Sequence, residues 1–429
     1  MILVHGGRVL DPGHYVGEAD LLIDEGRVMA VQAGLARRTA LRHIARIDAE
    51  GLLVVPGFVD LHAHLREPGF EYKETIATGT AAAVAGGFTT VCCMPNTNPV
   101  NDDIAVTAWI IERTKTTASA HVHPIGAITL GSAGRELADF RALKQAGCVA
   151  VSDDGRPVMG EEIMRRAMQS AAELDMPVID HCEDTRSSGC GCMNDGPVSR
   201  AMGWRGMPGD AEYRMIARDI RLARDTGVRL HIAHLSTADG VEMVRKAKSD
   251  GVRITAEVSP HHFTLTDDAV PTYGANAKMN PPLRRERDRA AVIEGLADGT
   301  IDAIATDHAP HAEYEKQWGM DWAPFGVIGL ETALGLTLGL VQQGRVTLQR
   351  AMTCLTSAPA AVLGLPRGTL EPGAAADVTV IDPEASWTVD PERFRSKSRN
   401  TPFAGWVLKG QVVRTLVAGM TVYQRPETL

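Results

Sequence analysis

The sequence predicts an α/β fold, namely a (β/α)8 TIM barrel with a small β-sandwich domain built from both termini. Three observations predict it. Strand-like and helix-like segments alternate through the middle of the chain, polar residues follow many of the strand-like runs, and both ends contain only short strands and turns. We therefore expect residues 1–53 and 363–429 to form the small β domain and residues 54–362 to form the catalytic barrel.

Composition limits the class of protein and its partners. Hydrophobic residues make up 44% of the chain, and 44 Lys and Arg against 53 Asp and Glu give a net charge of −9. This balance is typical of a soluble globular enzyme, and without a basic tract it argues against nucleic acid as a partner. No apolar run approaches the ~20 residues of a membrane span, and the N-terminus lacks the pattern of a signal peptide, so no membrane partner is expected.

The seven cysteines are an odd number and contain no Cys-x-x-Cys pair. Reduced thiols in a cytoplasmic protein are the simplest interpretation. The Cys190-Gly191-Cys192 segment could bind a metal or form a strained bridge, but an ordinary loop is favoured.

Short strands are expected near both termini. They lie at 2–4, 8–10, 19–23, 27–31, 376–381, 406–408 and 412–417. Turns such as Asp24-Glu25-Gly26 separate them. Because both β-rich ends flank an α/β middle, we expect one small domain assembled from the two, with separate flaps as the alternative.

Eight strand-like runs are expected in the middle of the chain, at 54–61, 88–93, 122–127, 148–152, 177–180, 230–233, 254–258 and 301–306. Helical patterns lie between most of them, for example at 162–174, 211–226 and 288–296. Eight β–α repeats favour a barrel over a doubly wound sheet. Residues 186–209 show no periodicity, so they form either a functional loop, such as a lid or partner contact, or a plain surface excursion.

Potential metal ligands follow five of these strands. They are His62 and His64, Asp153 and Asp154, His181, His234, and Asp307. Side chains two residues apart on a strand point the same way, so His62 and His64 should lie side by side. An isolated His-x-His pair is equally typical of a packed strand end. In a barrel, however, the carboxyl ends of all strands meet at one mouth, and the joint placement favours a metal site.

Four histidines and two carboxylates exceed the needs of one tetrahedral zinc ion. They fit two metal ions bridged by a carboxylate, with a bridging hydroxide as the nucleophile. Asp307 could bind one ion and also relay a proton. His231 should face away from the site, because it lies three residues before His234 on a strand. His261 and His262 are expected either to contact the ligands from outside or simply to pack.

Several motifs together resemble the amidohydrolase superfamily and, within it, the class I bacterial dihydroorotases. The resemblance covers nearly the whole chain. It rests on Asp60-Leu61-His62-Ala63-His64-Leu65-Arg66-Glu67-Pro68-Gly69, Met94-Pro95-Asn96-Thr97, Ser152-Asp153-Asp154-Gly155, His181-Cys182-Glu183-Asp184, Ala256-Glu257-Val258-Ser259-Pro260-His261-His262, Lys278-Met279-Asn280-Pro281-Pro282-Leu283-Arg284, Ala305-Thr306-Asp307-His308-Ala309-Pro310-His311 and Ala323-Pro324-Phe325-Gly326. It implies a barrel of the metal-dependent hydrolase type and the reversible cyclisation of N-carbamoyl-L-aspartate to L-dihydroorotate in pyrimidine synthesis.

The resemblance also implies a metal arrangement with two Zn2+ ions per subunit. His62, His64 and Asp307 would bind one ion, His181 and His234 the other, and Asp154 would bridge them. Many relatives bridge with a carboxylated lysine, which strand 148–152 does not offer. Asp153 is the alternative bridge, because adjacent strand residues face opposite ways.

Substrate recognition needs a cationic donor for a carboxylate, and Arg66, two residues after His64, suits that role. By resemblance, Asn96 and His311 are the other carboxylate ligands, and Asn280 binds the pyrimidine ring. Phe325 and Gly326 would offer backbone groups to the ring, and His64 would contact the substrate as well as the metal.

Other functions share parts of this pattern. A hydantoinase or allantoinase would use the same barrel and metals, but the aspartate in place of a strand lysine disfavours both. A non-catalytic partner of aspartate transcarbamoylase would lack ligands, whereas this chain keeps all six. The resemblance further implies a homodimer, and in part of the family an active enzyme in complex with transcarbamoylase, for which residues 186–209 are the candidate contact.

Overall fold

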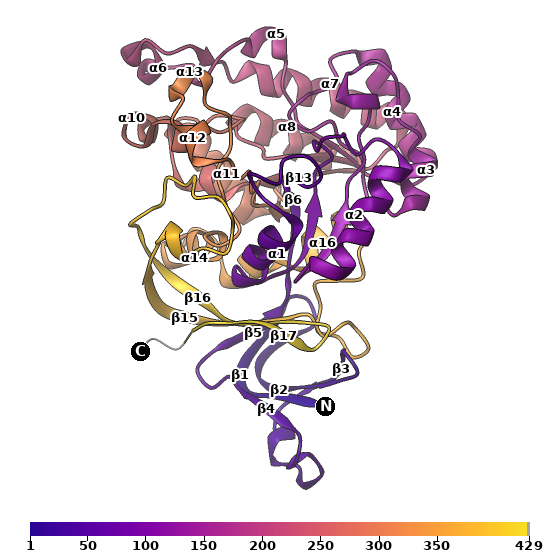
Figure 1. Cartoon of the computed structure of the whole chain (residues 1–429), viewed down its shortest axis with the longest axis vertical. Coiled ribbons are helices and arrows are strands. Elements are labelled where there is room, and N and C mark those ends of the chain that lie inside the picture. The colour runs from indigo at the N-terminus through magenta and orange to yellow at the C-terminus, as the bar shows by residue number, and fades with distance from the viewer. Residues whose placement is uncertain (427–429) are drawn as a thin grey trace.

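The computed structural model describes residues 1–426 and divides them between a β-sheet and a larger α/β part (Figure 1). Eight strands form one sheet in the order β17-β16-β15-β5-β1-β2-β3, with β4 paired to β1. Their bounds are β1 Ile2–Asp11, β2 Tyr15–Asp24, β3 Arg27–Gln32, β4 Ala45–Asp48, β5 Leu53–Pro56, β15 Val378–Thr388, β16 Val407–Val417 and β17 Met420–Gln424. Strands from both ends of the chain therefore share one sheet, and the sandwich form of the small domain stays a prediction.

This sheet is more continuous than the sequence suggested. Segments 2–4 and 8–10 belong to the single strand β1, which a bulge between Val4 and Gly7 interrupts. Likewise, β16 covers both 406–408 and 412–417 apart from Trp406. In each case register shifts change the side-chain alternation within a strand, and the sequence pattern therefore suggested two strands.

Two parallel sheets lie in the α/β part. One has the order β6-β7-β8, and the other has the order β14-β13-β12-β9. Their strands are β6 Phe58–Ala63, β7 Phe88–Cys93, β8 His121–Pro124, β9 Val178–Asp180, β12 Leu230–Ile232, β13 Ile254–Val258 and β14 Ala303–Ile304. Isolated parallel bridges extend these sheets, between Gly126 and Val151, between Val151 and Val178, and between Ala63 and His308.

Two of the expected strands differ from the prediction. The segment expected as one strand at 54–61 is divided at Gly57: β5 joins the terminal sheet, and β6 begins the parallel one. A Cβ at Gly57 would lie 2.1 Å from Thr89 Oγ1, so only glycine permits this close crossing. The segment expected as a strand at 148–152 does not form a continuous strand. Only Val151 pairs with its neighbours, through two isolated bridges.

Helices connect and cover the parallel strands. The longer ones are α1 Ile76–Ala85, α2 Ile104–Thr117, α3 Phe140–Ala146, α4 Glu161–Glu173, α7 Asp210–Thr226, α8 Ala238–Ser249, α11 Glu286–Asp298, α14 Ala333–Gln342, α15 Leu348–Leu355 and α16 Ser357–Leu363. The prediction of helices at 162–174, 211–226 and 288–296 is thus confirmed within two residues. Acidic residues in the first turn of α7 and the left-handed Gly227 after its last residue explain its limits.

The segment 186–209, which lacked periodicity, has short elements of its own. They are α5 Thr185–Ser188, β10 Met193–Asn194, α6 Pro197–Met202 and β11 Gly206–Met207. The other short elements are α9 Pro260–Thr264, α10 Val270–Tyr273, α12 Glu313–Lys316 and α13 Gly319–Trp322, with 3-10 turns at Leu35–Arg37, Thr39–Leu41, Leu130–Ser132, Asp267–Ala269, Gly274–Ala277 and Pro391–Arg393. Within residues 1–426, no helix is long and apolar enough to cross a membrane. In the same range, all seven cysteines are free thiols.

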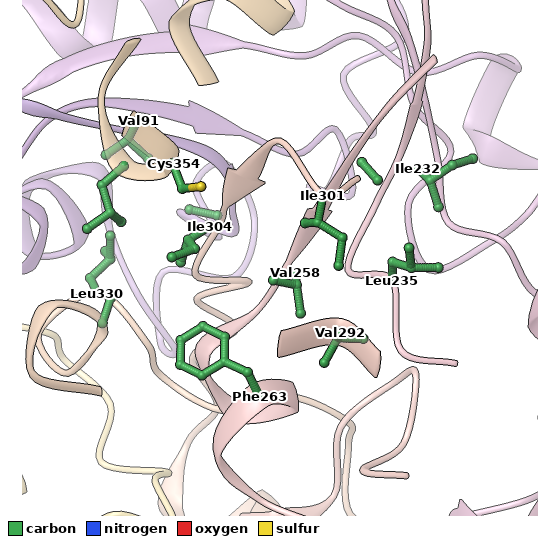
Figure 2. Packing of buried hydrophobic residues seen from close by; sticks show 14 of the residues in the cluster. Val91, Ile232, Leu235, Val258, Phe263, Val292, Ile301, Ile304, Leu330 and Cys354 are labelled. Atoms are coloured by element: carbon green, nitrogen blue, oxygen red, sulfur yellow. The ribbon is translucent and has the colours of Figure 1, made fainter. Parts of the chain in front are cut away.

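The main hydrophobic core lies between the parallel strands and their helices (Figure 2). Ile304 on β14 is 1% exposed and belongs to this core together with Val258 and Phe263. We expect Ile304→Val to lower the free energy of unfolding by about 0.5–1.5 kcal/mol, because one buried methyl group is lost. Urea unfolding would measure this change, and Val407→Ala at an exposed position is the control, with an expected effect within about 0.5 kcal/mol. An equal loss in both variants would contradict this assignment of the core.

Candidate metal centre and substrate site

The predicted histidine pair lies at the end of β6 beside Asp307. His62 is fully buried, His64 follows the last residue of the strand, and the two ring centroids are 5.3 Å apart. Asp307 Oδ1 lies 3.2 Å from His64 Nε2 and 3.6 Å from His62 Nε2. Three potential ligand atoms from two distant parts of the chain thus lie within 4.8 Å of one another.

Asp154 contacts all four predicted histidines. Its Oδ1 lies 3.4 Å from His62 Nε2 and 3.6 Å from both His181 Nδ1 and His234 Nε2, and its Oδ2 lies 3.6 Å from His64 Nε2. Burial raises the pKa of Asp154, but the charge of His62 and hydrogen bonds with the other imidazoles lower this pKa well below its usual range. Asp154 is therefore a carboxylate placed between both groups of histidines.

Asp153 faces another part of the structure. Its Oδ1 accepts hydrogen bonds from the backbone N–H groups of Ile128 at 2.8 Å and Thr129 at 3.1 Å, and its Oδ2 accepts one from the Thr129 hydroxyl. These contacts fix the loop after β8. The geometry therefore favours Asp154, the bridge that the resemblance implies, over the alternative Asp153.

His181 and His234 bring a second pair of imidazoles to Asp154. His181 Nδ1 lies 2.9 Å from His234 Nε2, and the ring centroids are 4.7 Å apart. The rings of His62 and His234 are also close, with centroids 5.1 Å apart. The residues predicted at five strand ends thus converge on one buried space.

Three residues of this region have left-handed backbone conformations. The φ angles are 61° for Arg66, 33° for His234 and 46° for Asp307. Such conformations cost a non-glycine residue about 1–3 kcal/mol and concentrate at functional sites, where the surrounding structure imposes them. Each of the three residues follows a different parallel strand, so the strained residues lie where these strand ends meet at the site.

The donor set of this region fits a divalent metal. Among the described residues, the buried His62 Nε2 has no hydrogen-bond partner. Burial lowers the pKa of His62, but Asp154 and Glu257 raise it well above its ordinary value, so the surroundings favour a positive charge here. Imidazole nitrogens and carboxylate oxygens are also the ligands that zinc accepts in hydrolytic enzymes. Two ligand groups share His62: one includes His64 and Asp307, and the other includes Asp154 and His234.

A third cluster of potential ligands does not have this character. Asp180, Cys182 and Asp219 lie close together and are buried. Arg218 Nε donates a hydrogen bond to Asp219 Oδ1 at 2.8 Å, and its Nη2 lies 4.0 Å from Asp180 Oδ2. Because a guanidinium already balances these carboxylates, the cluster is a structural ion pair.

The sequence did not reveal the role of Glu257, which lies on β13. Its Oε1 lies 2.8 Å from His62 Nδ1, and its Oε2 lies 3.1 Å from His231 Nε2. Burial raises the pKa of Glu257, but the hydrogen bonds with His231 and His62 bring it down to about 2. A charged residue inside the apolar strand 254–258 is the signal that could have identified it.

Glu183 contacts the site on the side of His181. Its Oε2 lies 3.0 Å from His181 Nε2 and accepts a hydrogen bond at 2.8 Å from Asn280 Nδ2. The same Asn280 nitrogen lies 3.3 Å from His181 Nε2. The predicted ring-binding Asn280 therefore lies directly beside a predicted metal ligand.

The residues predicted to bind the substrate carboxylate also lie beside the histidines. Arg66 Nη2 lies 3.3 Å from His311 Nε2, and its Nε donates a hydrogen bond to the Pro310 carbonyl at 3.1 Å. Burial lowers the pKa of Arg66 to about 10, so the guanidinium stays charged at neutral pH. Asn96 Oδ1 lies 2.9 Å from His64 Nδ1. Arg66, Asn96 and His311 could therefore all face an anionic group next to the metal ligands.

The backbone groups of Phe325 and Gly326 are partly engaged within the protein. The Gly326 N–H donates to the Lys278 carbonyl at 2.8 Å, and the Gly326 carbonyl accepts from Asn400 Nδ2 at 3.1 Å. The Phe325 carbonyl lies 2.7 Å from His311 Nε2. Each carbonyl keeps a second lone pair for a ligand, whereas the Gly326 N–H is already used.

His261 and His262 follow β13 and are buried. Burial lowers the pKa of His261 to about 4, so it is neutral at physiological pH. His262 Nε2 lies 2.9 Å from the Pro281 carbonyl, which makes packing its role here.

Comparison with known proteins identifies the family. The model of the Dihydro-orotase-like family matches residues 51–240. The dihydroorotase of Syntrophotalea carbinolica is 54% identical to this chain over 424 residues, which cover 99% of each protein. The chain belongs to the dihydroorotase family. A dihydroorotase from Pelotomaculum thermopropionicum is similarly related, with 55% identity over 99% of this chain and 98% of the relative.

Solved structures of other cyclic amidohydrolases resemble this member of the dihydroorotase family. The L-hydantoinase (dihydropyrimidinase) of Arthrobacter aurescens has a TM-score of 0.88 and 26% identity, covering 100% of this chain and 97% of its own. The dihydropyrimidinase of Brevibacillus agri has a TM-score of 0.85 at 22% identity, covering 98% and 95%, and shows the shared fold alone. The family resemblance predicted from the motifs is thus confirmed, as is the α/β fold.

Proposed function

We propose that this protein is a dihydroorotase, which interconverts N-carbamoyl-L-aspartate and L-dihydroorotate. The observation that carries the proposal is the identity of 50–55% to proteins named dihydroorotase over 99% of the chain. The buried His and Asp constellation beside a cationic arginine supplies suitable chemistry for a cyclic amide that bears a carboxylate.

We also infer a closed (β/α)8 barrel within the predicted range 54–362, beginning after β5, and a small β domain formed by residues 1–56 and the described part of 363–429. The parallel bridges at Val151 and between Ala63 and His308 support closure, because they lie where the two parallel sheets meet. The eight-stranded sheet of terminal segments supports the second domain. In such a barrel the active site is built at the carboxyl ends of the strands.

Two divalent ions, which we take to be zinc, would be held by the residues around Asp154. His62, His64 and Asp307 would hold one ion, His181 and His234 the other, and Asp154 would contact both. When bound, such ions polarise a carbonyl oxygen and increase the acidity of water. The Nε2 atom of His62 would serve this role after giving up its proton, since it has no hydrogen-bond partner among the described residues.

Asp307 would move the proton of the reaction. In ring opening, its carboxylate accepts a proton from the attacking water and delivers it to the ring nitrogen as the amide bond breaks. Burial raises the pKa of Asp307, but the His64 hydrogen bond and the charge of His62 lower it well below its usual range. Asp307 is therefore ionised before reaction, as a proton acceptor must be.

The neighbouring side chains would orient the substrate. Arg66, with Asn96 and His311, would bind its carboxylate, and Asn280 would bind the ring. This anchoring places the ring amide beside His64 and Asp307, which belong to the same cluster. Orientation of this kind replaces a random encounter by a fixed geometry and lowers the activation barrier.

The proposal predicts a clear substrate preference. Purified, metal-quantified protein should open L-dihydroorotate at least about a hundredfold more efficiently than hydantoin or allantoin, because only a ring carboxylate engages the Arg66 guanidinium. Steady-state kcat/KM values for the three compounds measure this preference. The similarity to the L-hydantoinase structure makes hydantoin the competing substrate, and its preferential cleavage would overturn the assignment.

The proposed reaction also has a pH-dependent equilibrium. Ring closure converts a carboxylate into a neutral carbonyl and consumes one proton, so low pH favours dihydroorotate and high pH favours carbamoyl aspartate. We expect the ratio of dihydroorotate to carbamoyl aspartate to fall about tenfold per pH unit above the carboxyl pKa, as one-proton linkage requires. Chromatography of mixtures equilibrated with enzyme from both directions would measure this ratio. A ratio independent of pH would exclude this reaction.

A further inference from the structure

A buried carboxylate connects the predicted metal ligands to a histidine outside the ligand set. Glu257 on β13, His62 on β6 and His231 on β12 are all fully buried. Glu257 Oε1 lies 2.8 Å from His62 Nδ1, and Oε2 lies 3.1 Å from His231 Nε2. One carboxylate therefore connects strands of both parallel sheets.

The contact with His62 determines which of its nitrogens is free. A carboxylate only accepts hydrogen bonds, so His62 Nδ1 must carry a hydrogen, and a metal can bind this imidazole only through the lone pair of Nε2, once any proton there has left. That lone pair belongs to the nitrogen that lies 3.4 Å from Asp154 Oδ1 and 3.6 Å from Asp307 Oδ1. Hydrogen bonding on one side of the imidazole thus prepares the other side for a metal.

His231 in turn fixes the carboxylate. Its Nε2 donates to Glu257 Oε2, while its Nδ1 lies 2.8 Å from the hydroxyl of Thr255 and can accept from it. Without His231, one oxygen of a fully buried carboxylate would lose its donor, and the side chain could rotate away from His62. The expectation that His231 faces away from the metal ligands is compatible with this indirect role.

Glu257 also reaches the second group of ligands. Its Oε1 accepts a hydrogen bond at 3.4 Å from the backbone N–H of His234, whose left-handed φ of 33° is unfavourable for a non-glycine residue. The Leu235 N–H donates to the Glu257 carbonyl at 2.9 Å. The side chain and backbone of one residue therefore hold both His62 and the turn that carries His234.

We propose that Glu257, supported by His231, is a positioning residue of the metal centre that fixes the tautomer of His62 and the backbone of His234. This inference rests on the proposed function, because it assumes that those histidines bind metal. It assigns to Glu257 no contact with substrate. Removing such an outer hydrogen-bond partner typically weakens metal affinity 10- to 100-fold.

The test measures zinc affinity directly. Metal-free full-length protein is titrated with Zn2+ in competition with a chromophoric chelator, for wild type, Glu257→Leu and Glu257→Gln. We expect Glu257→Leu to bind zinc 10- to 100-fold more weakly. Glu257→Gln should lie nearer to wild type, because its amide oxygen can still accept from His62 and from the His234 N–H. Wild-type affinity in Glu257→Leu would overturn the inference.

One further variant separates positioning from general stability. Asp11→Leu is the matched control, since Asp11 is a buried carboxylate of the terminal sheet. It accepts hydrogen bonds from the Leu370 N–H and the Thr369 hydroxyl. It should lower the Tm of the metal-free protein but leave zinc affinity unchanged. Glu257→Leu should instead reduce the rise in Tm that zinc produces. An equal loss of affinity in both variants would show a merely structural role and contradict the inference.

His231→Leu keeps the inference testable if Glu257→Leu does not fold. We expect it to weaken zinc binding several-fold, because Glu257 stays but loses one donor, and unchanged affinity would remove His231 from the proposal. The dihydroorotate assay on wild type tests the proposed function separately. An active wild type with zinc affinity insensitive to these variants would refute the positioning role alone, whereas a wild type that binds no zinc would refute both.

Discussion

Asp307→Asn is expected to lower kcat for dihydroorotate ring opening by at least about a thousandfold. The amide keeps the shape of the side chain but cannot accept a proton, and general acid–base catalysis alone contributes about 10²–10⁴-fold. The substitution also removes a negative charge 3.2 Å from His64 Nε2, which weakens the metal ligand group. Steady-state kinetics and metal analysis on the same samples would separate the two losses.

Asp302→Asn is the matched control for this experiment. Asp302 lies five residues earlier, just before β14, and its Oδ2 pairs with Lys248 Nζ at 2.7 Å. Because this ion pair is partly exposed, its loss should cost no more than about 1 kcal/mol of stability and should leave kcat unchanged. Full activity of Asp307→Asn, or an equal loss in Asp302→Asn, would contradict the assigned role of Asp307.

The sequence predicted those parts of the site that follow from strand ends. His62 and His64 are two residues apart, and Asp307 follows β14, so a parallel arrangement alone brings them together. The choice between Asp153 and Asp154 could not be predicted from alternation, because the segment 148–152 forms isolated bridges and imposes no regular pleat. Only the side-chain contacts distinguish these two residues.

Sequence patterns could not predict the contacts between distant segments. Glu257 is 195 positions from His62, yet the two share a hydrogen bond, and no spacing rule relates them. The short elements between 185 and 207 are likewise set by tertiary contacts, such as the hydrogen bond from Asn194 to Asp267. Local periodicity predicts elements that bury a regular face, and these segments bury none.

Asp154→Asn and Asp153→Asn should have opposite consequences, although the residues are adjacent. Asp154 contacts four imidazoles as a carboxylate. If it is the proposed ligand of both ions, its neutral amide should bind less metal and lower kcat by at least about a thousandfold. In Asp153→Asn, the amide oxygen can still accept from Ile128 and Thr129, and its NH2 group can donate to the Thr129 hydroxyl.

Asp153→Asn should therefore keep its metal and its activity, and lose no more than about 1.5 kcal/mol of stability, the net value of one hydrogen bond. Metal content, kcat and urea unfolding of both variants measure the difference. If Asp153→Asn loses metal while Asp154→Asn keeps it, Asp153 is the bridge. The two residues are of the same type and differ only in the direction that the backbone gives their side chains. The result therefore tests whether the backbone geometry after segment 148–152 selects the metal ligand.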